Sequence, residues 1–558
     1  MSLAEVEATL CARGMPFEME AVQIRGVSTR VWKNAPANLR VLADHARTHG
    51  SRLITIYEDE RITYEAWFRA VGRLAEDFRA RGIAKGDRIA LAMRNLPEWP
   101  VAFFAATTIG AIAVPLNAWW TGEELQFGLE NSGAKLLVCD GERWERIAPH
   151  RAACPALDHV VVTRMDEADA SVERLEDIIG LSQDWPNLPA GALPDVAIAP
   201  DDPATIFYTS GTTGQPKGAL GSHRNLTTNI LSSAYAAART MLRRGEEPAP
   251  AGPKVGLTVI PLFHVTACSA SLMGQLFAGH TVIYMHRWDT VKAFELIERE
   301  RVNLTGGVPT IAWQMLEHPD RDRYDLSSLE SIAYGGAPAA PELVRKIREV
   351  FGAMPGNGWG MTETMATVTS HTAEDYLNRP DSCGPPVPVS DLRITDERGH
   401  ELPTGKVGEL WARGPQIVMG YWQRPDATAE TFVDGWVRTG DLARLDEEGF
   451  CYIVDRAKDM IIRGGENIYS SEVENVLYDH PAVTDAAIIG LPHRTLGEEP
   501  AALVHLAPGM EATERELQDW VAARLAKFKV PVRIVFAEDT LPRNANGKIL
   551  KKDLGALF

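Results

Sequence analysis

Residues 208–218 read YTSGTTGQPKG, a run of Gly, Ser and Thr with one lysine, Lys217, near its end. The apolar pattern ATIFYTS (204–210) predicts a buried strand before this run, and RNLTTNILSSAYAAA (224–238) predicts a helix after it. A glycine- and hydroxyl-rich loop between a strand and a helix exposes backbone N–H groups that bind anionic oxygens. A plain surface loop has a similar composition. The stretch therefore predicts a phosphate-binding loop only if other motifs support it.

Two common nucleotide-binding loops do not fit the sequence. Lys217 is followed by Gly218 and not by Ser or Thr after a Gly-Lys pair, so the stretch is not a Walker A loop. The segment GNGWG (356–360) lacks the third glycine of a dinucleotide fingerprint at the required spacing. A different kind of nucleotide site is expected.

Length, charge and cysteine content limit the classes of protein to consider. The 558 residues suggest about two to four domains, and a hydrophobic content of 45% can supply a large core. The net charge of −18 argues against nucleic acid or an anionic membrane surface as a partner. No C-x-x-C pair occurs among the six cysteines, and Glu5 and Glu7 precede the first basic residue, Arg13. We therefore expect a cytoplasmic protein.

One uncharged stretch, residues 99–122, is long enough to cross a bilayer. Pro100, Gly110 and Pro115 interrupt it. A buried helix followed by a buried strand explains the stretch better, so no membrane span is expected.

The order of short apolar runs and amphipathic patterns predicts an α/β fold. Strand and helix patterns alternate from residue 88 to 140 and again from 204 to 352, which is typical of βαβ units around parallel sheets. Closely spaced strand patterns follow from about residue 385, at 391–399, 408–414 and 448–455, and predict a small β-rich subdomain. A final α+β segment begins at 456, where Ser471-x-x-Glu474 predicts a capping box at the start of its first helix.

Three further motifs contain residues that suit nucleotide chemistry. In GNGWGMTET (356–364), Trp359 can stack on a base and Glu363 can hold Mg²⁺ on phosphate oxygens. In RTGD (438–441), Asp441 can accept hydrogen bonds from ribose hydroxyls, although an Asx turn is an equal alternative. In PRNANGK (542–548), Lys548 lies on a predicted exposed turn. Taken singly, a core tryptophan, a solvated glutamate and a surface lysine explain these residues as well.

The motifs taken together resemble the adenylate-forming superfamily, and within it the acyl-CoA synthetases. The resemblance covers residues from about 30 to the end and rests on the order of YTSGTTGQPKG, YGGAP (334–338), GNGWGMTE, RTGD, DRAKDMIIRGGENIYSSEVE (455–474) and PRNANGK. It implies an N-terminal domain, 1–455, with two βαβ-rich sheets and a β-barrel-like subdomain at about 385–455. It also implies a mobile C-terminal α+β domain, 456–558, with its hinge at Lys458.

The resemblance implies two half-reactions. A carboxylic acid and MgATP give acyl-AMP and pyrophosphate, and the thiol of CoA then gives a thioester and AMP. The implied catalytic residues are Lys548, Thr362, Glu363, which also binds the metal, and His264. The implied nucleotide- and CoA-binding residues are Thr209, Ser210, Gly211, Thr212, Thr213, Gly214, Lys217, Gly335, Gly336, Ala337, Asn357, Gly358, Trp359, Gly360, Asp441, Arg456, Gly464 and Gly465.

These roles agree with the chemistry of the first step. An ionised carboxylate is already a nucleophile, so adenylation needs charge stabilisation rather than a general base. A lysine on a mobile domain, such as Lys548, can supply that charge and then withdraw. The chain departs from the usual pattern at Asp455, where many relatives have Gly, and at Lys551, where an arginine is common. Neither departure removes an assigned group.

The segment PLFHVTA (261–267) bears on the substrate. Amino-acid-activating relatives place an Asp after an aromatic residue here, whereas this chain has His264 after Phe263. The implied acyl pocket is mostly apolar and uncharged, and consists of His264, Val265, Thr266, Gly335, Met365, Ala366 and Thr367. We therefore expect a hydrophobic acid, fatty or aryl-substituted.

Three alternatives stay open: an enzyme that loads a carrier protein, a luciferase-like oxygenase and a catalytically silent scaffold. Retention of Lys217, Glu363, Asp441 and Lys548 argues against the scaffold. The expected partners are the acid, ATP and CoA, with no nucleic acid, and a homodimer is also expected.

Overall fold

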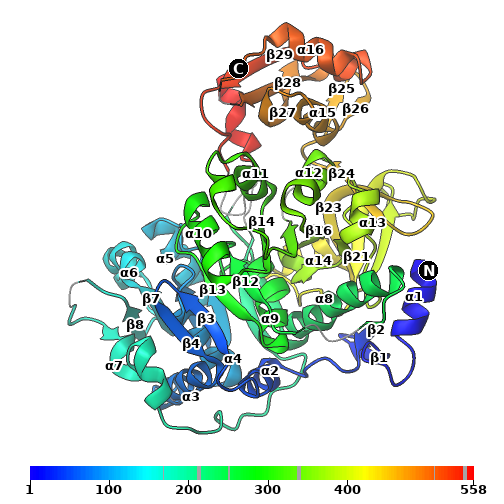
Figure 1. The fold of residues 1–558 in the computed structure, drawn as a ribbon. Helices are drawn as coiled ribbons and strands as arrows, with labels where there is room; N and C mark the ends of the chain where they lie inside the picture. The colour runs from blue at the N-terminus through cyan, green and yellow to red at the C-terminus, as the bar shows by residue number, and fades with distance from the viewer. Residues whose placement is uncertain (167–168, 210–214, 249–251, 336–340, 508, 544–548) are drawn as a thin grey trace.

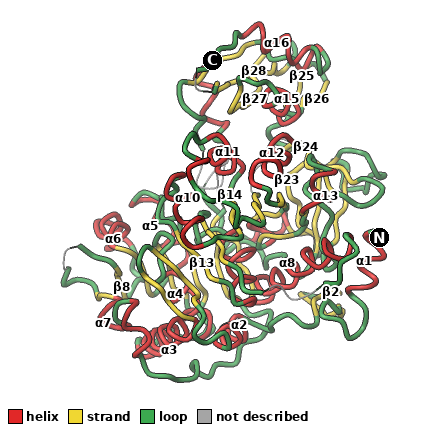
Figure 2. The backbone as a smooth tube through the Cα atoms, in the orientation of Figure 1, coloured by secondary structure: helices red, strands yellow, loops and turns green. Residues whose placement is uncertain are grey.

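The structure is a computed structural model that describes all residues of the chain except 167–168, 210–214, 249–251, 336–340, 508 and 544–548. Its largest part is built on two sheets with helices packed around them (Figures 1 and 2). No helix in the described ranges is long and apolar enough to cross a membrane. The α/β class expected from the sequence is confirmed.

The first large sheet has seven strands in the order β11-β10-β6-β5-β7-β8-β9. All neighbours are parallel except β10 and β11, which are antiparallel. The strands are β5 (Arg88–Ala92), β6 (Ile112–Pro115), β7 (Leu136–Asp140), β8 (His159–Thr163), β9 (Glu173–Arg174), β10 (Pro203–Tyr208) and β11 (Gly218–Ser222).

The second large sheet has eight strands in the order β19-β16-β15-β14-β12-β13-β3-β4, parallel except at its two edge pairs. The strands are β3 (Leu53–Tyr57), β4 (Glu60–Thr63), β12 (Val255–Thr258), β13 (Thr281–Tyr284), β14 (Leu304–Gly307), β15 (Ser331–Tyr334), β16 (Met354–Asn357) and β19 (His371–Thr372). Helices α10 (Thr290–Glu300), α11 (Pro309–Glu317), α12 (Pro341–Phe351) and α13 (Ala373–Asn378) belong to this half.

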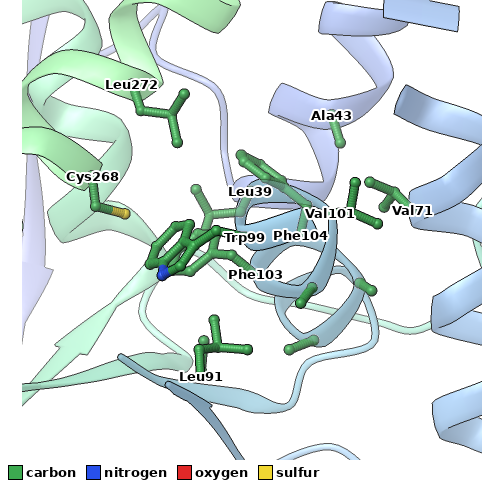
Figure 3. Packing of buried hydrophobic residues seen from close by; sticks show 14 of the residues in the cluster. Leu39, Ala43, Val71, Leu91, Trp99, Val101, Phe103, Phe104, Cys268 and Leu272 are labelled. Carbon is green, nitrogen blue, oxygen red and sulfur yellow. The ribbon is translucent and has the colours of Figure 1, made fainter. Parts of the chain in front are cut away.

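Residues 99–116 of the uncharged stretch are buried in the core, whereas Trp119 near its end is exposed. Every residue of α4 (Glu98–Thr108) is buried. Figure 3 shows Trp99, Phe103 and Phe104 of this helix among side chains of its neighbours. The rings of Trp99 and Phe103 stack with their centres 5.1 Å apart. Helices α2 (Leu39–Arg47) and α3 (Tyr64–Ala80) pack against α4. Helices α8 (His223–Arg243) and α9 (Met273–Ala278) contribute side chains to the same apolar core.

Local sequence signals mark the ends of two helices, α5 and α12. Thr121 and Glu124 form a capping box at the start of α5 (Gly122–Ser132), and Gly133 ends this helix in the left-handed region at φ 62°. Gly352, at φ 66°, follows α12 in the same way. The remaining elements of this part are α1 (Leu3–Leu10), β1 (Met19–Ile24), β2 (Val27–Trp32), α6 (Gly141–Ile147) and α7 (Leu175–Ile179).

The β-rich subdomain is an antiparallel sheet of five strands. They are β20 (Asp391–Thr395), β21 (Gly408–Arg413), β22 (Phe432–Val433), β23 (Trp436–Leu445) and β24 (Cys451–Arg456), with α14 (Pro425–Thr431) beside them. A two-stranded ribbon, β17 (Gly360–Met361) with β18 (Ala366–Thr367), precedes the subdomain.

The C-terminal part lies apart from the two large sheets, at the top of Figure 1, and has its own apolar core. Its sheet has the order β26-β25-β28-β27, with β29 paired to β28. The elements are β25 (Ile461–Arg463), β26 (Glu466–Ile468), α15 (Ser470–Tyr478), β27 (Val483–His493), β28 (Gly497–Leu506), α16 (Glu514–Ala522) and β29 (Arg533–Ala537).

The capping box predicted at Ser471 and Glu474 is wrong. Helix α15 begins at Ser470, and its N-cap, Tyr469, makes no side-chain cap. The hydroxyl of Ser471 donates to the carbonyl oxygen of Val454. Glu474 accepts a hydrogen bond from the backbone of Ile488 and forms an ion pair with Lys551 at 2.7 Å. Both side chains that a capping box would use therefore bind residues outside the helix instead.

Candidate active site

The glycine-rich stretch connects two antiparallel strands and does not run directly into a helix. The amide of Thr209 donates to the carbonyl of Lys217 over 2.9 Å, and the amide of Lys217 donates to the hydroxyl of Thr209 over 3.2 Å. The expected order of strand, loop and helix is wrong, because β11 lies between the loop and α8. Its sequence, GALGS, has no apolar pattern of its own, and its pairing with β10 makes it a strand. The predicted loop residues Ser210, Gly211, Thr212, Thr213 and Gly214 lie outside the described residues.

Glu363, the predicted metal ligand, lies in a short helical turn, Thr362–Thr364, that follows β17. Its carboxylate is buried, and burial raises its pKa above the usual range. The hydroxyl of Tyr421 donates to Oε1 of Glu363 over 2.7 Å. Nζ of Lys217 lies 4.8 Å from the centre of the Tyr421 ring. Lys217 and Glu363 therefore both contact Tyr421, a residue that the sequence motifs do not contain.

Tyr421 lies on a segment that pairs with β11. The backbone amide of Leu220 donates to the carbonyl oxygen of Gly420, and that of Met419 donates to the carbonyl oxygen of Leu220. The backbone amide of Trp422 donates to the carbonyl oxygen of Gly218. The amide of Val418 donates to the carbonyl oxygen of Glu363 over 3.0 Å. The three pairings with β11 join residues about 200 positions apart, and the bond from Val418 to Glu363 joins residues 55 positions apart. No local sequence signal could therefore identify Tyr421.

The predicted base and ribose residues lie together. The indole Nε1 of Trp359 donates to Oδ2 of Asp441 over 2.8 Å, and Nε of Arg456 lies 2.9 Å from Oδ1 of the same carboxylate. Asp441 is buried, and its amide donates to the hydroxyl of Thr439. Both carboxylate oxygens of Asp441 therefore have a donor.

The predicted glycines near Trp359 allow close backbone packing. A β-carbon at Gly360 would lie 1.6 Å from the carbonyl oxygen of Ala366, and one at Gly358 would lie 2.8 Å from that of Thr369. Among the residues that the structure describes, a β-carbon at Gly335 would meet only the carbonyl oxygen of Gly358, at 3.5 Å. The Asn357 side chain accepts a hydrogen bond from the amide of Gly358. Gly336 and Ala337 lie outside the described residues.

His264 of the predicted acyl pocket precedes a π-helical turn, Thr266–Leu272. Such turns are frequent at functional sites. Its Nε2 is buried and has no hydrogen-bond partner among the described residues. Burial lowers the pKa of His264 to about 3, so the imidazole is neutral at physiological pH. Val265 is buried, and the ring of Phe263 lies 4.6 Å from that of His264.

Met365, Ala366 and Thr367 of the predicted pocket are held by a buried side chain of α8. The side-chain Nδ2 of Asn229 donates to the carbonyl oxygen of Met365, and its Oδ1 accepts from the backbone amide of Thr367. Met365 and Ala366 have positive φ angles of 44° and 91°, which non-glycine residues rarely adopt. The Met365 side chain is fully buried, and its methyl carbon fills space that a β-carbon at Gly221 would need.

The predicted hinge, Lys458, lies in the segment between β24 and β25, and burial lowers its pKa. Next to it, Asp455 accepts a hydrogen bond from the amide of Ser470 at the start of α15. Burial raises the pKa of Asp455 to about 6. Gly464 and Gly465 form the turn between β25 and β26 at φ 61° and 90°, conformations that favour glycine.

Lys548 lies outside the described residues. The residues around it belong to the C-terminal part: Arg543 and Ile549 form an isolated antiparallel bridge, and Arg543 donates to the buried carboxylate of Asp485 over 2.6 Å.

Comparisons with known proteins agree with this arrangement. The sequence model of the family described as AMP-binding enzyme matches residues 42–422, and that of the AMP-binding enzyme C-terminal domain matches 472–548. The chain is 37% identical to a feruloyl-CoA synthase of Amycolatopsis over 89% of its own length and 94% of the relative. It is 35% identical to a long-chain-fatty-acid–CoA ligase of Mycobacterium tuberculosis over 88% of its length and 92% of that enzyme.

A solved structure is also similar. The o-succinylbenzoate CoA synthetase of Bacillus subtilis, in complex with its acyl-adenylate intermediate, superposes with a TM-score of 0.75 and 31% identity, covering 93% of this chain and 98% of that one. The chain therefore belongs to the AMP-binding enzyme family and is an AMP-forming acyl-CoA synthetase of the adenylate-forming superfamily.

Proposed function

We propose that this enzyme activates a hydrophobic carboxylic acid, fatty or aryl-alkanoic, as acyl-AMP and transfers the acyl group to CoA. ATP, Mg²⁺ and CoA are the cofactors of this reaction. The observation that carries the proposal is the convergence of Lys217 and Glu363 on Tyr421. It combines a cation for phosphate oxygens with a carboxylate for a metal ion in one buried place.

The residues present fit a magnesium–nucleotide ligand. Mg²⁺ is held in such sites by one or two carboxylates together with substrate phosphates. Glu363 offers one buried carboxylate, and Thr362 beside it offers a hydroxyl for the α-phosphate. When bound, Mg²⁺ supplies charge neutralisation on the phosphate oxygens. In the proposal, Trp359 packs against adenine and the Asp441–Arg456 pair orients the ribose.

In the first half-reaction, a carboxylate oxygen of the acid bonds to the α-phosphorus, and the bond from that phosphorus to pyrophosphate breaks. No proton moves, because the acid is ionised at neutral pH. Lys217 stabilises charge on the departing pyrophosphate, and Lys548 bridges the acid and α-phosphate oxygens. The neutral His264 places no positive charge in the acyl pocket, which agrees with a hydrophobic acid.

In the second half-reaction, the sulfur of CoA bonds to the acyl carbon and the bond from that carbon to the phosphate oxygen breaks, releasing AMP. Lys548 must leave the site before the thiol enters, and rotation about Lys458 would remove it. Gly464 and Gly465, without β-carbons, would let the pantetheine arm approach the backbone closely. A mobile C-terminal domain that begins at 456 is part of the same proposal.

A panel of hydrophobic acids with MgATP, assayed for AMP release with and without CoA, tests the function. A CoA-dependent thioester with a fatty or aryl-alkanoic acid is expected. Product formed only with a carrier protein would identify a carrier-loading enzyme. If no acid supports pyrophosphate exchange, the protein is a silent scaffold. Cytoplasmic location and a homodimer remain predictions from the sequence.

A further inference from the structure

Tyr421 separates the two charged groups that the nucleotide site needs. Its hydroxyl donates to Oε1 of Glu363 over 2.7 Å, and its ring centre lies 4.8 Å from Nζ of Lys217. Only 8% of Tyr421 is exposed, so water competes little with either contact. Hydrogen bonds to a carboxylate and cation–π contacts are both strengthened by desolvation.

In this arrangement Tyr421, and not Lys217, contacts the carboxylate of Glu363, and Lys217 contacts the Tyr421 ring. Among the described residues, the carboxylate of Glu363 has one side-chain hydrogen bond, from Tyr421, and forms no ion pair. A lysine ammonium that paired directly with this carboxylate would occupy the oxygens that a metal needs. The Tyr421 ring instead receives the ammonium, and its hydroxyl binds only one carboxylate oxygen.

Tyr421 is itself held from several sides. Its amide donates to the hydroxyl of Thr428 over 2.9 Å, and it forms a β-bridge with Ala219. The guanidinium of Arg25, on the turn between β1 and β2, donates to the carbonyls of Ile417 and Val418 just before it. The phenol therefore has a fixed position relative to Glu363, as a residue that orients a ligand must.

We propose that Tyr421 is a positioning residue of the adenylation site: its hydroxyl orients the Glu363 carboxylate for Mg²⁺, and its ring holds Lys217 for the triphosphate. This inference rests on the proposed function. Tyr421→Phe removes only the hydroxyl and keeps the ring for Lys217. Loss of a residue that orients a metal ligand typically weakens metal binding by about 10- to 100-fold.

The test is calorimetric titration of Mn²⁺, a substitute for Mg²⁺, into enzyme that is saturated with a non-hydrolysable ATP analogue. Tyr421→Phe should weaken Mn²⁺ binding by about 10-fold or more. Tyr452→Phe is the matched control, because its hydroxyl also donates to a carboxylate, that of Asp446 at 3.0 Å, in the same subdomain. This control should bind Mn²⁺ as the wild type does.

A double-mutant cycle separates positioning from a general structural effect. If Tyr421 acts through Glu363, Tyr421→Phe should cause no further loss of Mn²⁺ affinity in a Glu363→Gln background. Should Tyr421→Phe be unstable, Thr428→Val, which removes the hydroxyl that holds the Tyr421 amide, should give a smaller loss in the same direction.

The outcomes distinguish this inference from the proposed function. Wild-type enzyme that neither binds the Mn²⁺–analogue complex nor exchanges pyrophosphate would overturn the proposed function. Wild-type enzyme that does both, together with a folded Tyr421→Phe variant of unchanged Mn²⁺ affinity, would overturn the role of Tyr421 alone. The role of Tyr421 would also be overturned if Tyr421→Phe lowered Mn²⁺ affinity by the same factor in wild-type and in Glu363→Gln enzyme.

Discussion

The indole N–H of Trp359 donates to Oδ2 of Asp441 over 2.8 Å, although the two residues are 82 positions apart. Nε of Arg456 lies 2.9 Å from the other oxygen of Asp441. The residues proposed to contact the base and the ribose are thus one hydrogen-bonded unit. Substitution of one of them removes a hydrogen-bond or ion-pair partner of another.

Asp441→Asn should therefore raise the KM for ATP by about 10-fold or more, because hydrogen bonds to charged groups contribute about 1.5–3 kcal/mol each. The KM for CoA should stay near the wild-type value. Steady-state kinetics with each substrate varied in turn checks this, with Asp446→Asn as a control in the same subdomain. An equal rise in both KM values would contradict a role confined to the nucleotide.

Lys548→Ala should slow adenylation by about 100- to 1,000-fold, the usual effect of removing a group that stabilises developing charge. Thioester formation from a supplied acyl-AMP should be nearly unchanged, because in the proposed cycle Lys548 leaves the site before the second half-reaction. Pyrophosphate exchange and single-turnover thioester assays measure the two steps, with Lys552→Ala as a neighbouring control. Equal losses in both steps would refute the assignment.

Lys458→Pro should block rotation of the C-terminal domain, because proline fixes φ near −65°. Pyrophosphate exchange should be largely retained and the overall thioester rate should fall at least about 10-fold. Lys458→Ala, which leaves the backbone free, is the matched control. The hinge role fails if the proline variant makes thioester at the wild-type rate.

Asp455 should make stability depend on pH. Burial raises its pKa to about 6 in the folded protein from the ordinary 3.8, so the folded state binds an extra proton between these values. Its contribution to stability is therefore greatest below about pH 4 and falls as the pH rises through 6. Each pH unit between the two pKa values is worth about 1.4 kcal/mol, so the full effect is about 3 kcal/mol.

Asp455→Asn should remove the loss of stability that ionisation of Asp455 causes as the pH rises. The asparagine keeps a side-chain oxygen that can accept a hydrogen bond from the amide of Ser470. The variant should melt at a higher temperature than the wild type at pH 8 and at the same temperature at pH 4. Thermal denaturation across this range, with Asp446→Asn for comparison, provides the measurement. A constant difference between variant and wild type at all pH values would contradict the account.

Sequence patterns predicted the elements whose signals are local. The uncharged stretch at 99–122 predicted a buried helix followed by a buried strand, and α4 and β6 agree with that prediction. The capping box at Ser471 failed because Val454 and Lys551, which are distant in the sequence or outside the helix, compete for its side chains.

The candidate site could be predicted only where a motif supplied the residue. Trp359, Asp441 and Arg456 come from three motifs, and the structure brings them into contact. Tyr421 was missed because its partner Glu363 is 58 positions away and its segment is placed by pairing with β11, a strand with no apolar signal. Residues 210–214 and 544–548, which include five residues of the glycine-rich stretch and Lys548, are not described, so their roles stay predictions.

If Met365 lines the acyl pocket as proposed, its buried thioether limits how mutation can change the range of accepted acids. Its terminal methyl carbon would lie 2.1 Å from a β-carbon at Gly221, so the two positions share one volume beneath β11. Trimming Met365 to alanine to enlarge the acid site would first leave a void in the sheet, at a cost of about 2–5 kcal/mol. Combinatorial libraries that vary positions 221 and 365 together, with a small residue at one and a larger one at the other, should yield more folded catalysts than libraries that vary either alone.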